Sequence, residues 1–319
     1  MTETNRPLLE IKNAVKRFPM PGGRTLTAVN DVSCEIRPRE CLAVIGESGC
    51  GKSTLAKLVM GVEPMTSGEI LLDGELISGQ KRARQKRVWR DMQMIFQNAA
   101  EVISPRMKIG DFLMEPWRNF RMADRQTARE TILSVLDDVR LDESCLPKYP
   151  HQLSGGELQR VCIARAFSMD PKFLVCDEIT GALDVSVQDD VMRLFQDMRE
   201  ESGTACLFIC HDLALVSGCS DRVMVMYLGS AVEILRSREL GTRALHPYTR
   251  ALLGAMFFMG MRGEGRTIRI PKGETPSPVD LPEGCPFRAR CPRAKAVCAE
   301  EKPPLRRVGE DHWAACHDL

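Results

Sequence analysis

The sequence predicts an α/β fold with a phosphate-binding loop at a strand-to-helix turn. Three observations predict it. Residues 46–54 match G-x-x-x-x-G-K-[ST] at every fixed position. The apolar run 41–45 precedes this loop as a buried strand would, and apolar residues recur at helical spacing over 55–59. Two further apolar runs, 173–176 and 206–210, lead into acidic or histidine residues, as strands do when they end at a ligand site in an open α/β sheet.

The loop chemistry follows from its residue types. Glycines let the backbone curl so that several N–H groups point at a phosphate, and the following helix adds its positive N-terminal end. Lys52 can reach the β- and γ-phosphates, and the Ser53 hydroxyl can ligate Mg²⁺. The residues expected to contact the nucleotide are Gly46, Ser48, Gly49, Gly51, Lys52, Ser53 and Thr54. A chance glycine-rich turn is disfavoured by the flanking strand and helix. The motif alone does not separate a kinase, a GTPase and a motor.

Composition sets broad limits. The chain has 319 residues, enough for about two domains or one large domain with an appendage, and a formal charge of +1. Its charged residues are of mixed sign, which gives no strong steer toward nucleic acid. No run approaches the roughly 18 apolar residues of a membrane-spanning helix. The first seven residues lack an apolar signal core. We therefore expect a chain that stays in the cytosol and does not itself span a bilayer.

The rest of the chain can be interpreted in order. Residues 8–36 contain short strands around a Pro-Gly-Gly turn at 21–23, and a strand at 68–74 is bracketed by turn residues. An apolar strand at 92–97 is followed by a helical pattern over about 112–169. The apolar positions typical of these helices are Ile132, Val135, Leu136, Val139, Val161, Ile163, Ala164 and Ala166. Residues 251–261 form a short apolar helix, and residues 262–284, rich in Gly, Pro and charge, indicate a linker.

One basic run and one aromatic residue have two explanations each. Lys81 to Arg90 carries six basic residues and includes Trp89, which could indicate nucleic-acid binding. A solvated helix face is favoured, because the chain as a whole is not basic. Phe18 could stack on an adenine ring or be an ordinary core side chain, and its spacing does not decide.

Acidic and polar residues after the apolar strands are the candidate catalytic groups. Asp177 can hold the Mg²⁺ shell, often through water, while Glu178 can polarise the water that attacks the γ-phosphate. A surface turn with two acids is disfavoured by the four apolar residues before it. His211 could contact the γ-phosphate, and Gln97 could ligate Mg²⁺ or position water. Each of these two residues is a weak signal alone.

The stretch Leu153-Ser154-Gly155-Gly156-Glu157 helps to distinguish among the classes of phosphate-loop protein. Ser-Gly-Gly before a helix can present a hydroxyl and backbone N–H groups to an anion. The first phosphate loop already binds one side of a triphosphate. A second anion-binding turn about a hundred residues later therefore suggests a nucleotide closed from the far side by another subunit.

The chain resembles the ATP-binding-cassette (ABC) ATPases over roughly residues 8–235. The resemblance rests on the phosphate loop, on Gln97, on the signature 153–157, on the strand that ends in Asp177 and Glu178, on the turn at Asp184 and on His211, in the family's order. It implies a P-loop NTPase (RecA-like) nucleotide-binding domain with an antiparallel β subdomain and a helical subdomain. It also implies ATP and Mg²⁺, with Lys52, Gln97, Glu178 and His211 as catalytic residues and Ser53, Gln97 and Asp177 around Mg²⁺.

The family works as a head-to-tail dimer of cassettes with two ATP molecules at the interface. By this resemblance Ser154, Gly155 and Gly156 act on the ATP of the partner cassette. Phe18 then matches the adenine-stacking aromatic.

Within the superfamily, three stretches look like the oligopeptide/dipeptide importer subfamily, whose relatives import nickel and opines. They are 182–188, 246–253 and 284–292, and they match the second of the two ATPase subunits somewhat better than the first. The resemblance implies a second ATPase subunit (usually a different chain), two transmembrane permease subunits and a solute-binding protein. It places the chain on the cytoplasmic face of the inner membrane and implies no nucleic acid.

Four departures from the family pattern stand out. Glu157 replaces the commonest Gln, Ile179 replaces Pro, and Gly181 replaces Ser. Residues 98–103 replace a Pro-Ser-Leu run in the loop that usually couples to the membrane subunits, and an unusual partner and weakened coupling are the two explanations. The catalytic set is complete, which predicts hydrolysis.

Cysteines concentrate at the end of the chain. Nine of thirteen are scattered among mostly apolar residues and behave as buried thiols. The other four, Cys285, Cys291, Cys298 and Cys316, have the spacing C-x5-C-x6-C-x17-C, unlike common zinc ribbons. Four thiolates fit zinc or an iron–sulfur cluster, and reduced surface thiols are the alternative. The subfamily resemblance implies a [4Fe–4S] cluster.

These expectations define the domains and the competing functions. We expect an ABC ATPase domain over 1–236 with a helical subdomain at about 98–168, a C-terminal helix and linker over 237–284, and a Cys-rich extension over 285–319. The predicted function is the ATP-hydrolysing energy-coupling subunit of an importer of di- and oligopeptides, and the same role in an importer of nickel, an opine or another small solute is the alternative. A soluble cassette ATPase of translation or DNA repair is disfavoured, because the chain has one cassette and no sustained heptad run.

Overall fold

The computed structural model describes residues 6–80, 82–260, 275–281 and 283–319. The chain forms two compact units, and each is described by itself. The first unit comprises residues 1–36, 41–79 and 209–319, and the second comprises residues 37–40 and 80–208. Residues 262–274 and 282 of the predicted linker, and the last residue of the helix predicted over 251–261, lie outside the described residues.

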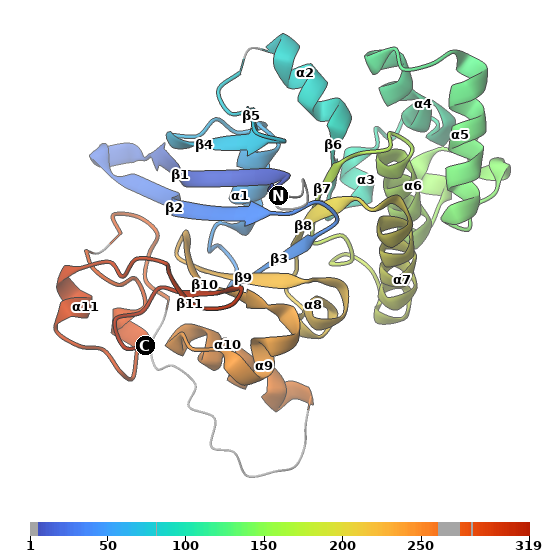
Figure 1. Cartoon of the computed structure of the whole chain (residues 1–319). Coiled ribbons are helices and arrows are strands. Elements are labelled where there is room, and N and C mark those ends of the chain that lie inside the picture. Colours follow the sequence, from blue (N-terminus) through green and yellow to red (C-terminus); the bar gives the residue numbers. More distant parts are fainter. Residues whose placement is uncertain (1–5, 81, 261–274, 282) are drawn as a thin grey trace. The chain divides into compact units, whose positions relative to one another are not determined.

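The first unit contains an antiparallel sheet in the order β2-β1-β4-β5 (Figure 1). Its strands are β1 (Leu9–Pro19), β2 (Thr25–Ile36), β4 (Ser67–Leu72) and β5 (Glu75–Leu76). Leu9 pairs with Ile36 of β2 and with Leu72 of β4. The predicted strands and the turn at 21–23 are confirmed, although β1 and β2 are long strands of 11 and 12 residues where short ones were expected. Val279 forms an isolated bridge with Leu26 on the free side of β2.

The second sheet of this unit carries the phosphate-loop strand. β3 (Cys41–Ile45) runs parallel to β9 (Arg222–Tyr227), and all five of its residues are buried, which explains its unbroken apolar run. Antiparallel strands continue the sheet from β9, in the order β10 (Ser230–Arg236), β12 (His312–Ala314) and β11 (Arg306–Gly309). The helices of the unit are α1 (Lys52–Val59), α8 (Leu213–Cys219), α9 (Leu240–Arg243), α10 (Pro247–Gly260) and α11 (Val297–Glu300).

The second unit has parallel strands and most of the long helices. β6 (Met92–Ile95) pairs in parallel with β7 (Phe173–Asp177), and β8 (Ala205–Ile209), whose last residue belongs to the first unit, lies beyond β7. The helices are α2 (Arg82–Asp91), α3 (Ala99–Val102), α4 (Ile109–Phe120), α5 (Arg125–Asp138), α6 (Gly155–Phe167) and α7 (Val185–Ser202). The helical pattern predicted over about 112–169 is confirmed by α4, α5 and α6.

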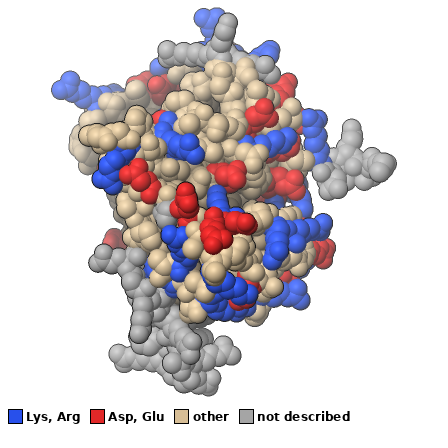
Figure 2. Space-filling view, turned by 90° about the vertical axis from the view of Figure 1, so that its left-hand side faces the viewer, with Lys and Arg blue, Asp and Glu red and all other residues tan. Residues whose placement is uncertain are grey.

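Surface charge agrees with the composition. Figure 2 shows Lys and Arg interspersed with Asp and Glu on one face of the molecule. Among the described residues, no helix is both long enough and apolar enough to cross a membrane.

Candidate functional site

The glycines of the phosphate loop are required by close backbone contacts. A Cβ atom on Gly46 would lie 2.3 Å from the carbonyl oxygen of Met226, and one on Gly51 would lie 2.0 Å from that of Ala28. Gly51 also has a φ of 105°, a left-handed conformation that favours glycine. The loop is therefore packed between β2 and the end of β9, and no larger residue fits at either position.

Lys52 lies inside the curl of this loop. Its side chain is buried, and Nζ donates hydrogen bonds to the carbonyl oxygens of Gly46 at 2.9 Å and Glu47 at 3.1 Å. Nζ is also 3.9 Å from Sγ of Cys50. Burial raises the pKa of the Cys50 thiol, while the charge of Lys52 opposes this rise. The ammonium group is thus held among the loop's own polar atoms.

The other phosphate-loop residues are more accessible. Ser48 and Gly49 are exposed, and Ser53 and Thr54 are half-buried in the first turn of α1. The first N–H groups of a helix have no partner within the helix, so this turn is suited to an anion. The structure therefore presents hydroxyl and backbone donors at one end of α1, as the motif predicts.

His211 lies close to the start of the loop. The N–H of Cys210 donates to the carbonyl oxygen of Val44 at 3.3 Å, two residues before Gly46. His211 follows directly and is exposed. Phe18 is half-buried near the end of β1, and Nζ of Lys16 lies 4.6 Å from the centre of its ring. The stacking role of Phe18 stays a prediction.

In the second unit, Gln97 and Glu178 follow paired strands. Ile95 of β6 is in register with Cys176 of β7, so Gln97 and Glu178 each come two residues after a matched pair. The backbone of Glu178 has a φ of 51°, a conformation that costs a non-glycine residue on the order of 1–3 kcal/mol. Such a conformation is uncommon for a residue other than glycine, and it follows directly on the end of β7.

The turn after Glu178 explains one departure from the family pattern. The N–H of Gly181 donates to the carbonyl oxygen of Glu178 at 2.8 Å. A Cβ on Gly181 would lie 3.1 Å from Nε2 of Gln97, which is tighter than an ordinary contact. Glycine at position 181 therefore gives the Gln97 amide room beside the acidic turn. Asp177, at the end of β7, is half-buried.

The signature segment caps α6. Oγ of Ser154 accepts a hydrogen bond from the N–H of Glu157 at 3.3 Å, and Oε2 of Glu157 accepts from the N–H of Ser154 at 2.8 Å. These bonds form a capping box. The N–H of Ser154 and its hydroxyl, which donates to Oε2 at 2.8 Å, together lower the pKa of the Glu157 carboxyl. Ser154 and Gly155 are exposed, whereas a Cβ on Gly156 would lie 2.6 Å from Cγ1 of Val187. The exposed hydroxyl and N–H groups are thus fixed at the start of a helix.

The unusual loop after Gln97 forms the short helix α3. Asn98 caps it, because its side-chain oxygen accepts from the N–H of Ala100 at 3.2 Å and its side-chain nitrogen donates to Glu101 at 2.8 Å. Phe96, just before Gln97, is 40% exposed. The substitution at 98–103 therefore still gives a defined local structure.

The four C-terminal cysteines are free thiols in the first unit. Burial raises the pKa of Cys285 to about 11, and negative charge on Cys298, Cys291 or Cys316 would raise it further, so the four thiols interact electrostatically. The donor chemistry fits zinc or iron. However, the described residues contain no group of three or more His, Cys, Asp or Glu side chains arranged to hold a metal ion.

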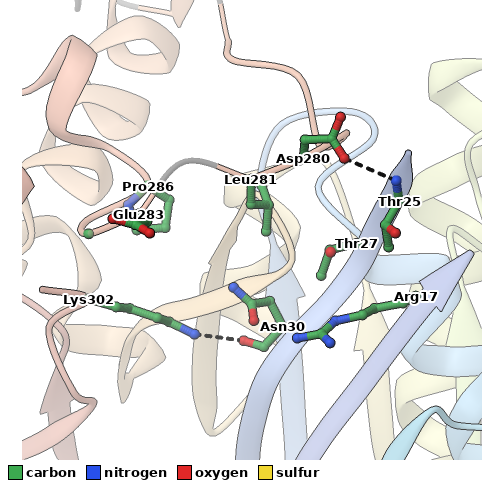
Figure 3. A pocket seen from close by; sticks show the side chains of 10 residues that line it. Arg17, Thr25, Thr27, Asn30, Asp280, Leu281, Glu283, Pro286 and Lys302 are labelled. Atoms are coloured by element: carbon green, nitrogen blue, oxygen red, sulfur yellow. Dashed lines mark hydrogen bonds between the residues drawn. The ribbon is translucent and has the colours of Figure 1, made fainter. Parts of the chain in front are cut away.

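A pocket with a volume of about 400 Å³ lies beside β1 and β2. The sequence does not predict this pocket. Figure 3 shows that Lys302 donates to the carbonyl oxygen of Asn30 at 2.9 Å and that Asp280 accepts from the N–H of Thr25 at 3.0 Å. Burial lowers the pKa of Lys302. Residues from β1 and β2 and residues after 279 build this pocket together, so no local pattern marks it.

A second group that the sequence does not predict surrounds Glu47 in the phosphate loop. The side chains of Tyr248, Thr275 and Arg290 all reach this residue. They come from the part of the chain that follows the ATPase pattern, more than 200 residues from Glu47 in sequence.

Comparisons with known proteins identify the family of the chain. The family model for ABC transporters matches residues 29–181, and a model described as the oligopeptide/dipeptide transporter C-terminal region matches residues 232–298. The chain is 42% identical over 315 residues to the oligopeptide transport ATP-binding protein OppF of Escherichia coli, which covers 96% of this chain and 94% of that protein. It is 42% identical over 303 residues to the di/tripeptide transport ATP-binding protein DppF of Pseudomonas aeruginosa, with 95% and 93% covered.

Solved structures give the same fold. A dimeric, post-hydrolysis ATP-binding cassette, MJ0796 bound to ADP and phosphate, superposes with a TM-score of 0.66 at 26% identity, covering 72% of this chain and 99% of that chain. The structure of cbiO1 from Clostridium perfringens, part of an ABC transporter complex, superposes with a TM-score of 0.66 at 25% identity, covering 74% and 91%. The predicted P-loop NTPase fold is confirmed, and the chain belongs to the family of ABC transporter ATP-binding proteins, in its oligopeptide/dipeptide branch.

Proposed function

We propose that this chain is the ATP-hydrolysing subunit of an importer of di- and oligopeptides. The observation that carries the proposal is the identity of 42% over nearly the whole chain to peptide-transport ATP-binding proteins, which includes the C-terminal region. Selectivity for the solute lies with other subunits of such systems. Peptide is therefore inferred from the relatives and not from a residue of this chain.

The catalytic roles follow from the chemistry of each side chain. Lys52 binds the β- and γ-phosphates, and Glu178 polarises the attacking water. His211 contacts the γ-phosphate, and Gln97 positions the water. The close approach of the Gln97 amide to Gly181, three residues after Glu178, supports a shared role for Gln97 and Glu178. Phe18 stacks on the adenine.

Magnesium has a suitable set of donors. The hydroxyl of Ser53, the side-chain carbonyl of Gln97 and the carboxylate of Asp177 are hard oxygen ligands, the type that Mg²⁺ prefers. When bound, the ion neutralises charge on the phosphates. Asp177 supplies the carboxylate that compensates the ion, and Ser53 presents its hydroxyl from the first turn of α1.

The signature residues act on a second cassette. Ser154, Gly155 and Gly156 bind the γ-phosphate of an ATP held by the partner ATPase, which we propose is a different chain. ATP binding closes the pair because it fits the closed state better, and hydrolysis reopens it. Two permease subunits follow this cycle and release solute delivered by a binding protein. The chain then works on the cytoplasmic face of the inner membrane. We further propose that the ATPase domain ends at residue 236 and that the Cys-rich extension follows residue 284.

The C-terminal thiols hold a metal centre in this proposal. Cys285, Cys291, Cys298 and Cys316 bind a [4Fe–4S] cluster, with zinc as the alternative. The occurrence of all four cysteines within the last 35 residues supports a shared site, whereas the described side chains are not arranged as a metal site. Iron, sulfide and zinc analysis of anaerobically purified protein tests it, and a colourless, metal-free protein would refute it.

Transport in proteoliposomes tests the function itself. The chain is reconstituted with its permeases and its partner ATPase, and uptake of labelled di- and oligopeptides is compared with uptake of nickel and of an opine. We expect ATP-dependent uptake of peptides. Uptake of nickel or an opine alone would contradict the peptide assignment, while co-purification with ribosomes or DNA in place of membrane proteins would contradict the importer.

The variant Glu178→Gln tests the hydrolytic role in the same preparation. We expect a loss of phosphate release of about 10²- to 10⁴-fold with ATP binding retained, because only the base is removed. Glu201→Gln, an exposed substitution near the end of α7, is the matched control. Unchanged hydrolysis in Glu178→Gln would refute the assignment.

A further inference from the structure

Glu47, the second residue of the phosphate loop, is held by the C-terminal part of the chain. Nη1 of Arg290 donates to both carboxylate oxygens of Glu47 at 3.0 Å each. Oγ1 of Thr275 donates to Oε2 at 2.6 Å. The backbone N–H of Glu47 donates to the phenol oxygen of Tyr248 at 2.9 Å. Both the side chain and the main chain of one loop residue are therefore fixed from outside the loop.

The ion pair is partly buried. The side chain of Arg290 is 11% exposed and that of Glu47 is 29% exposed. The guanidinium also lies 5.8 Å and 5.9 Å from the ring centres of Tyr227 and Phe287, and Nη1 donates to the Tyr227 hydroxyl at 3.4 Å. Removing one partner of such a pair would leave the other charge partly buried without compensation, which is destabilising.

The contact leads directly to the phosphate-binding lysine. The carbonyl oxygen of Glu47 accepts from Nζ of Lys52 at 3.1 Å. A displacement of Glu47 would therefore change both the path of the loop's N–H groups and the position of the Lys52 ammonium. Phosphate binding by such a loop depends on several donors converging on one point.

We propose that Arg290 is a positioning residue for nucleotide binding. It fixes Glu47 so that the loop and Lys52 are already in place when the phosphates arrive. The Cys-rich C-terminal segment thereby acts on ATP affinity without touching the nucleotide. This inference rests on the proposed role of Lys52 and the loop in binding ATP.

The test is a set of variants in the full chain, assembled with its partner ATPase and permeases. ATP affinity and the KM and kcat of hydrolysis are measured for Arg290→Gln, Glu47→Gln and the double variant. We expect each single change to raise the dissociation constant and the KM for ATP about tenfold, with kcat changed less than about twofold. The double variant should be no weaker than either single variant, because both remove one interaction. Arg290→Lys, which keeps a cationic donor, should recover part of the affinity.

Arg288→Gln is the matched control. Arg288 lies two residues away and donates to the carbonyl oxygens of Glu283 and Ala299, so it contacts the C-terminal segment but not Glu47. We expect wild-type ATP affinity for it. Thermal midpoints show whether each variant is folded.

Three results would overturn the proposal: wild-type affinity in folded Arg290→Gln, additive losses in the double variant, or an equal loss in Arg288→Gln. A wild-type complex that binds no ATP would instead refute the proposed function, and the positioning role with it.

Discussion

The Lys52 ammonium donates to the carbonyl oxygen of Gly46 at 2.9 Å, so the basic side chain of the phosphate loop is bonded to the loop's first residue. The bond closes the loop around a buried positive charge. The first prediction concerns this charge.

Replacing Lys52 by Ala should weaken ATP binding by about 10- to 100-fold, since a charged hydrogen-bond donor to the phosphates is lost. Fluorescent-nucleotide titration of the purified chain measures the change. Lys57→Ala, an exposed position on the same helix, should bind as the wild type does. Equal binding by the Lys52 and Lys57 variants would rule out the assignment.

Gly51→Ala should abolish nucleotide binding and lower the thermal midpoint. The new Cβ would lie 2.0 Å from the carbonyl oxygen of Ala28, and backbone cannot yield as a flexible side chain can. Gly49→Ala is the control, because Gly49 also has a positive φ, of 77°, but no atom lies within 4 Å of its added Cβ. Gly49→Ala should show only the cost of strain, about 1–2 kcal/mol. A Gly51→Ala chain no less stable than the Gly49→Ala chain would contradict the close packing.

Glu157→Gln should be neutral, although the family more often has Gln here. A Gln side chain also carries an oxygen that can accept from the N–H of Ser154, so the capping box survives. Glu157→Ala loses it and should destabilise the chain by about 1 kcal/mol. Chemical denaturation compares the three proteins. The prediction is wrong if Glu157→Gln and Glu157→Ala lower the free energy of unfolding by the same amount.

Buried His246 predicts a loss of stability in acid. It is 1% exposed, and burial lowers its pKa from 6.5 to about 3, so the folded protein keeps it neutral while the unfolded chain takes up a proton. Stability should therefore fall as the pH drops below about 6.5 and continue to fall toward 3. The contribution at about pH 5.5 is about 1.4 kcal/mol relative to neutral pH.

His246→Asn should remove this part of the pH dependence. Nδ1 of His246 accepts from the N–H of Tyr248 at 3.1 Å, and the Asn oxygen can replace that acceptor. The pH dependence is measured as the difference between the unfolding free energies at about pH 5.5 and 7.5. His151→Asn, at an exposed position, is the control. Identical pH dependence in wild type and His246→Asn would show that the buried ring does not resist protonation.

Local patterns predict the elements that carry the chemistry. β3, β7 and β8 are unbroken apolar runs because both faces of these strands are buried, and the phosphate loop has a fixed spacing. The prediction misses β9 and β10, although an apolar run, the turn at Gly229 and a second apolar run mark them as a hairpin. β11 has no such signal: it is short, charged and mostly exposed, and it exists because it pairs with β12.

The residues of the candidate site also differ in whether the local sequence predicts them. Lys52, Asp177 and Glu178 could be predicted because each lies within a few residues of its strand. Arg290 could not be predicted, because it lies 243 residues from Glu47 in the sequence and no local pattern links the two residues. Only tertiary packing brings a guanidinium to that carboxylate.

The bridge between Leu26 and Val279 has a practical consequence. The N–H of Thr27 donates to the carbonyl oxygen of Pro278, and the N–H of Asp280 donates to that of Thr25, so the C-terminal segment covers the outer edge of β2. A chain shortened to the ATPase core would leave this strand edge with unpaired donors and acceptors, a template for joining strand to strand with other molecules. We therefore expect a protein shortened in this way to associate strand to strand, and light scattering should be measured before its activity is.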